Sequence, residues 1–98
     1  MTTALIFLID WFATHCDGEW EHDVGIAIST LDNPGWALNV RVEDTELSAV
    51  VVDWQTDEES EEVWVHWRST GRVFEARCGP RDLERALLAF QAFALQGR

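Results

Sequence analysis

The residues best suited to chemistry lie in one short cluster, His15-Cys16-Asp17-Gly18-Glu19-Trp20-Glu21-His22-Asp23. Imidazole, thiolate and carboxylate groups are the ligands of zinc and related metals, so a metal site is one interpretation. The spacing does not support it, because there is no CxxC or HExxH pattern and Glu21-His22 has no second His four residues on. We therefore predict that the protein holds no metal and no cofactor.

The same cluster could supply a nucleophile, since Cys16 with His22 or His66 and an orienting acid would form a Cys-His-Asp arrangement. However, Cys16 falls on the apolar stripe of a predicted helix, and burial of a thiol among acids raises its pKa and disfavours the thiolate. There is no phosphate-binding loop, nucleophile elbow or dinucleotide fingerprint in the sequence. We predict that the protein is not an enzyme. The alternative is a small metal- or thiol-dependent enzyme that uses the reactive side chains of the cluster, His15, Cys16, Asp17, Glu21 and His22.

A third interpretation of the cluster is partner binding, because Trp20 among acids combines an anchoring ring with charges that can meet Arg or Lys. A solvated connection is the plainer alternative. A second stretch, Asp53 to Glu62, carries six acids in ten residues and is either a solvated loop or an electrostatic docking surface. The predicted partner-binding residues are Asp17, Glu19, Trp20, Glu21, His22, Asp53, Asp57, Glu58, Glu59, Glu61, Glu62 and Trp64.

The overall charge indicates what kind of partner to expect. Eighteen acids against seven Arg and no Lys give a net charge of −11. Residues 1–40 carry −6, residues 41–67 carry −8 and residues 68–98 carry +3. This negative charge disfavours binding to nucleic acid or to an anionic membrane, and the expected partner is basic.

The 98 residues are predicted to form a single domain, 1–98, with ample apolar material at 47% of the chain. The apolar run Ala4 to Ile9 is too short for a signal peptide or a membrane span, so we expect a cytoplasmic protein. Cys16 and Cys78 are expected to be free thiols, as is usual in that compartment.

Periodicity predicts the elements that position these residues. Apolar side chains at helical spacing indicate a helix from Ala4 to about Cys16, ended by Gly18, and a second helix begins at Gly79-Pro80, with Asp82 in its first turn. Alternation of apolar and polar residues between them indicates four or five antiparallel strands. The predicted strands cover residues 24–30, 36–42, 47–54, 62–68 and 72–78.

Each helix and the sheet have one apolar face, which predicts an α+β fold of two layers with both helices on one face of the sheet. Alternation directs Val63, Val65 and Trp67 toward the helices, and it also directs Trp36 and Trp54 inward. The other face would then carry a polar and partly aromatic set of side chains. That set comprises Trp64, His66, Arg68, Asn39, Arg41, Asp53 and Glu75.

Two motifs carry a resemblance to a known family. Cys16-Asp17-Gly18-Glu19-Trp20-Glu21-His22, preceded by Trp11-Phe12, is followed by Gly25-Ile26 and then by Thr30-Leu31-Asp32-Asn33-Pro34-Gly35-Trp36. With these motifs, and with Gly79-Pro80 before the last helix, the chain resembles the immunity protein 53 family of bacterial polymorphic toxin systems. The resemblance implies a small cytoplasmic α+β protein that binds and blocks a cognate toxin domain.

The leading hypothesis is therefore stoichiometric neutralisation of a basic toxin, for which a nuclease is one candidate. The alternatives are the enzyme described above and an acidic regulatory interaction module; the chain is expected to be a monomer or a weak homodimer. Charge reversal of Glu58, Glu59, Glu61 and Glu62 should slow toxin capture, whereas neutralising Arg81 and Arg85 should do little.

Overall fold

The computed structural model describes residues 3–96, so residues 1, 2, 97 and 98 of the predicted 1–98 domain lie outside the described residues. It confirms the α+β class, with an N-terminal helix, a five-stranded antiparallel sheet and a C-terminal helix. In chain order the elements are α1 (Thr3–His15), α2 (Trp20–Asp23), β1 (Ile26–Leu31), β2 (Gly35–Arg41), β3 (Val51–Glu58), β4 (Trp64–Thr70), β5 (Val73–Cys78) and α3 (Leu83–Gln96).

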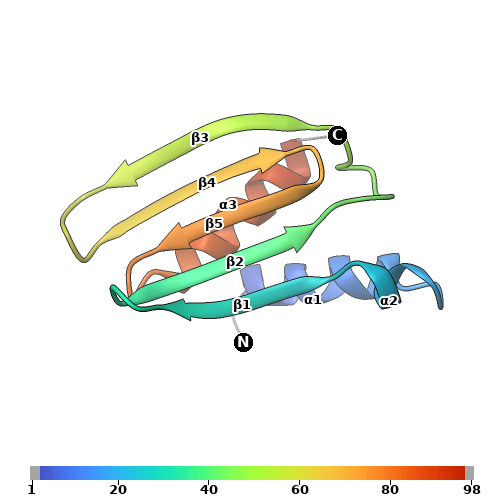
Figure 1. Cartoon of the computed structure of the whole chain (residues 1–98), viewed down its shortest axis with the longest axis horizontal. Helices are drawn as coiled ribbons and strands as arrows, with labels where there is room; N and C mark the ends of the chain where they lie inside the picture. The colour runs from blue at the N-terminus through green and yellow to red at the C-terminus, as the bar shows by residue number, and fades with distance from the viewer. Residues whose placement is uncertain (1–2, 97–98) are drawn as a thin grey trace.

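The strands are arranged in the order β1-β2-β5-β4-β3, and all neighbours are antiparallel (Figure 1). Residues 42–50 carry the chain from β2 to the far edge strand β3. This connection is fastened to the turn between β4 and β5, because the Val42 amide donates to the Arg72 carbonyl (2.9 Å) and the Ala49 amide donates to the Gly71 carbonyl (2.8 Å). As a result, β1 and β3 form the two edges of the sheet.

Both long helices lie on the same face of the sheet, as predicted (Figure 1). The Phe90 ring of α3 lies at the centre of the core, with its centroid 5.2 Å from both Trp11 of α1 and Phe74 of β5. Trp67 packs inward against Phe74 and Phe93, at 5.5 and 5.9 Å. No helix within residues 3–96 covers the opposite face of the sheet, and we call it the open face.

The prediction for the third strand is wrong at both ends. It was expected at residues 47–54, but β3 covers Val51–Glu58 and reaches into the acidic stretch. The segment before it is a compact turn, in which Asp44 and Ala49 have φ values of 61° and 68°, outside the extended region. Leu47 is fully buried beneath this turn, so its apolar character reflects packing of a loop.

A bulge in β3 reverses one predicted orientation. The pairing with β4 is interrupted between Val52 and Gln55, so the extra residue there changes the alternation of side chains. Trp54, expected to point inward, lies on the open face instead, is 43% exposed and has the Arg68 guanidinium 4.8 Å from its ring centroid.

The last helix begins at Leu83, three residues later than Pro80. The Gly79 amide donates to the Trp64 carbonyl (3.0 Å), which keeps the chain attached to the sheet at this point. Asp82 then precedes the helix: its carbonyl accepts the Ala86 amide (3.2 Å), and its carboxylate accepts the Trp64 amide (3.0 Å). The buried Asp82 thus connects the start of α3 to the start of β4.

Candidate functional site

Residues 17–21 form a compact turn that leads into α2. Asp17 Oδ1 accepts the amides of Glu19 and Trp20, both at 2.9 Å, and the Glu21 carboxylate accepts the amides of Asp17 and Gly18. The Trp20 amide, followed by that of Glu19, lowers the pKa of Asp17, and backbone donors led by its own amide lower the pKa of Glu21. These two acids therefore hold the local backbone, while Glu19 and His22 remain exposed.

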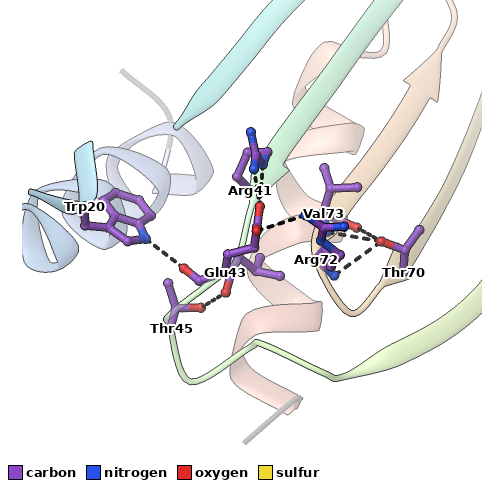
Figure 2. Close-up of polar contacts among 8 residues, drawn as sticks. Trp20, Arg41, Glu43, Thr45, Thr70, Arg72 and Val73 are labelled. Atoms are coloured by element: carbon purple, nitrogen blue, oxygen red, sulfur yellow. Dashed lines mark hydrogen bonds and ion pairs between the residues drawn. The ribbon is translucent and has the colours of Figure 1, made fainter. Parts of the chain in front are cut away.

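Trp20 was predicted to be a partner-binding residue and should therefore be exposed. Instead it is buried, with only 7% of its surface exposed. Its ring packs against Trp11 and Phe12, with centroids 5.9 and 5.7 Å away. Its indole N–H donates to the Glu43 carbonyl at 2.8 Å, as Figure 2 shows. Trp20 is therefore a core residue that attaches α2 to the end of β2, although its neighbours in the sequence are acids.

Glu43, a residue that sequence reasoning did not select, is the centre of the polar contacts at this end of the molecule (Figure 2). Its carboxylate accepts hydrogen bonds from the Arg41 guanidinium and from Arg72 Nη2, the latter at 3.3 Å. The hydrogen bonds from Arg41, and secondarily those from Arg72, lower the pKa of Glu43. Arginines thus neutralise part of the acidity next to α2.

The side chains proposed for enzymatic chemistry are not arranged around a common point. Cys16 is exposed, contrary to the prediction that it is buried on the helical stripe; partial desolvation, with Glu21 and Asp17 nearby, raises the pKa of its thiol. Both His15 nitrogens are engaged, Nδ1 with the Trp11 carbonyl (2.8 Å) and Nε2 with Glu46 (2.7 Å). Within residues 3–96 there is no group of three His, Cys, Asp or Glu placed to hold a metal ion.

The second acidic stretch is divided between two faces by the geometry of β3. Asp57 lies opposite the buried Val65 and turns toward the helices, where Arg85 of α3 donates to it at 2.7 Å and lies 3.6 Å from Glu59. Glu58 turns to the open face and bonds with His66 at 2.6 Å. Successive acids of this stretch therefore have different surroundings. Asp57 forms an ion pair on the helix side of the sheet, whereas Glu58 lies in a groove on the open face.

The groove has a volume of about 790 Å³ and lies on the open face, where the β1–β2 turn approaches the β3–β4 loop. Trp64 and His66 are neighbours in it, with ring centroids 5.0 Å apart. It is lined by Leu31, Asn33, Pro34, Glu58, Ser60, Glu61, Glu62, Trp64, His66, Arg77 and Pro80.

Most cations of the open face already have internal partners. Arg77 donates to the Asn39 side chain at 2.9 Å, and Arg68 donates to Glu75 at 2.6 Å. In contrast, no ion pair among the described residues involves Glu61 or Glu62, and both are exposed. The groove therefore combines unneutralised carboxylates with a partly buried Trp64.

The predicted binding residues do not form one surface. The chain extends 41 Å along its longest axis, and α2 and the β3–β4 loop lie at opposite ends of that axis (Figure 1). Glu58, Glu61, Glu62 and Trp64 come together in the groove, whereas Asp53 lies at the bulge of β3. Asp17, Glu19, Trp20, Glu21 and His22 form the distant end.

Sequence reasoning missed several residues of the groove. His66 could have been selected, because alternation had already placed it beside Trp64 on the open face. Asn33 and Pro34 could not, since only the sheet order brings the β1–β2 turn near the start of β4.

The fold and the site define a small two-layer α+β domain with an acidic, partly aromatic groove on its uncovered sheet face. The family model described as immunity protein 53 matches residues 5–94, a range from α1 to α3, and the chain belongs to the immunity protein 53 family. This membership supports an immunity function and implies a cognate toxin as the partner. Neither a curated protein nor a solved structure matches the chain. No helix within residues 3–96 is long and apolar enough to cross a membrane.

Proposed function

We propose that the protein neutralises a cognate toxin in the cytoplasm by forming a stoichiometric complex through the groove at the β3–β4 end. The observation that supports this surface is the gathering of Glu58, Glu61 and Glu62 around Trp64, with no arginine paired to Glu61 or Glu62 in the described residues. Neutralisation by binding requires no catalytic group.

The chemistry of the groove favours a basic toxin surface. The carboxylates of Glu58, Glu61 and Glu62 can accept hydrogen bonds from Arg or Lys of the toxin. The Trp64 ring can make apolar contacts and can also stack against a cation. If the toxin is a nuclease, the carboxylates would take the place of substrate phosphates. Long-range attraction would increase the association rate by about 10- to 1000-fold at low salt and would weaken as salt is added.

Arg85 acquires a part in this proposal that differs from the sequence expectation. Because Arg85 pairs with Asp57 and Glu59, its neutralisation would leave both acids without a cation, make this end of the molecule more negative and speed the capture of a basic toxin at low salt. Arg81 is exposed and has no ion pair among the described residues. Its neutralisation should change the rate of toxin capture little and serves as the control.

The test uses the cognate toxin domain, to be sought in the reading frame next to that of this chain, and measures the rate of association over a series of salt concentrations. The variant Glu58→Lys with Glu61→Lys and Glu62→Lys should bind more slowly and show a smaller salt dependence. A matched control with the same change of charge replaces exposed acids near the opposite end, Asp10→Lys with Glu19→Lys and Asp23→Lys. It should retain most of the wild-type rate.

Two results would contradict the proposal. Unchanged toxicity on co-expression, with no complex on gel filtration, would remove toxin neutralisation itself. A control variant that slows binding as much as the groove variant would leave neutralisation in place but move the interface away from the groove.

A further inference from the structure

The two edges of the sheet are protected very differently against pairing with another strand. The outer strand β3 carries Asp53, Asp57 and Glu58 and is interrupted by a bulge, features that discourage strand addition. The other edge, β1, has the sequence Ile-Ala-Ile-Ser-Thr-Leu, with no charge and no Pro. Its pairing with β2 is regular from Ile26 to Leu31, so no bulge turns this edge away.

An apolar groove of about 490 Å³ lies beside this edge, between α1 and β1. Ile9 and Ile28 are 47% and 42% exposed there. Glu21 is the one acid of the lining, and its oxygens accept the amides of Asp17 and Gly18. The lining consists of Leu5, Leu8, Ile9, Phe12, Glu21, Val24, Gly25, Ile26 and Ile28.

Charge decides which partner fits this surface. Two copies of a chain with a net charge of −11 repel each other and can approach closely only where charge is absent. The face formed by β1 and α1 comes nearest to this condition, because β1 has no charged residue and Glu21 is the one acid that lines the groove. A basic partner would instead be attracted to the acidic ends. The same face also carries both protruding side chains, Ile9 and Ile28, and a hollow to receive them, as a two-fold interface requires.

We propose that β1 is a homodimer interface, on which β1 of a second copy pairs in antiparallel orientation. A two-fold axis perpendicular to the sheet would join the two five-stranded sheets into one and place both α1 helices on the same face. Pairing at the edge leaves the open face of each sheet uncovered. The inference is therefore independent of the proposed toxin groove.

The test measures the mass of the full chain, without toxin, by sedimentation at increasing concentration and salt. The dimer should form with increasing concentration and strengthen from about 0.01 M to about 1 M salt, as the Debye length falls from about 30 to about 3 Å. Ile28→Glu should leave only monomer under all of these conditions. Leu88→Glu, which adds the same charge at an exposed Leu of α3, should dimerise almost as the wild type does.

A second measurement covers the case in which Ile28→Glu fails to fold. Amides of β1 in the wild type should exchange hydrogen more slowly at high than at low protein concentration, while those of β3 should not change. A wild type that stays monomeric at high concentration and salt would overturn the proposal. So would a dimer that Ile28→Glu leaves intact, or β1 protection that appears only with toxin present.

Discussion

Trp20 and Trp64 both lie close to acidic residues in the sequence, but their surroundings give them different roles. Trp20 is enclosed by aromatic rings and donates to a backbone carbonyl, while Trp64 lies in a groove beside His66. Alternation along β4 was enough to place Trp64 and His66 on the open face, and the structure confirms it. Trp20 lies in a one-turn helix of four residues, too short for any sequence period to show which side is buried.

The role assigned to Trp20 predicts a graded loss of stability. Trp20→Phe retains most of the ring and loses the hydrogen bond to Glu43, so the free energy of unfolding should fall by about 1 kcal/mol, with an added cost for the smaller ring. Trp20→Ala should lower it by about 3–5 kcal/mol. Urea denaturation followed by circular dichroism measures both changes.

The matched control is Trp54→Ala, which removes the same ring from an exposed site on the open face. We expect a loss of about 1 kcal/mol or less. If Trp54→Ala were as damaging as Trp20→Ala, the core position of Trp20 would not explain its effect.

At the scale of the elements, the loop between β3 and β4 is shaped by a contact within the loop and by a contact with a residue distant in the sequence. The Ser60 hydroxyl accepts the Val63 amide at 3.1 Å, which shapes the tip of the loop. The loop also lies against Gly79 at the end of β5: a Cβ at Gly79 would come within 2.0 Å of the Glu62 carbonyl oxygen. One rim of the groove is therefore set by a glycine that follows it by seventeen residues.

This contact predicts that Gly79→Ala destabilises the protein by about 3 kcal/mol or more, because backbone atoms rather than a flexible side chain must move. The comparison is Gly25→Ala, where a Cβ would have nothing within 4 Å. That variant should range from no change to about 1 kcal/mol of stabilisation. Thermal unfolding measures both, and equal effects would show that the Glu62 contact does not restrict Gly79.

The two long helices and the five strands were predictable in type and order because their periods are clear, but their ends and the one-turn helix α2 were not. The third strand was placed four residues early because Leu47 and Val50 are apolar in a turn. The last helix was placed three residues early because the Gly79 and Asp82 contacts with β4 are long-range. Local pattern carries no information about such contacts.

For the molecule as a whole, the excess of acids over arginines has a cost in stability. Eighteen acids face seven Arg, and the ion pairs within residues 3–96 involve seven of those acids, two of them with His alone. The resulting repulsion should favour the unfolded chain at low salt.

Adding salt should therefore raise the melting temperature between low and moderate ionic strength. Screening that contributes about 1 kcal/mol would raise Tm by about 4–8 °C for a domain of this size. The groove variant with three Lys should respond less, because its net charge is closer to zero. A Tm that falls as salt is added would mean that attractive ion pairs, such as that of Arg85 with Asp57, outweigh the repulsion.

The sequence by itself determined the fold class, the two layers, the family and the acidic character of the surface, because these follow from periodicity, composition and motifs. Only the tertiary structure decided which acids act together. The sheet order placed the two acidic stretches at opposite ends of the molecule, and the pleat of β3 sent Asp57 toward Arg85 and Glu58 into the groove. Proximity in space depends on long-range pairing, which no local pattern contains.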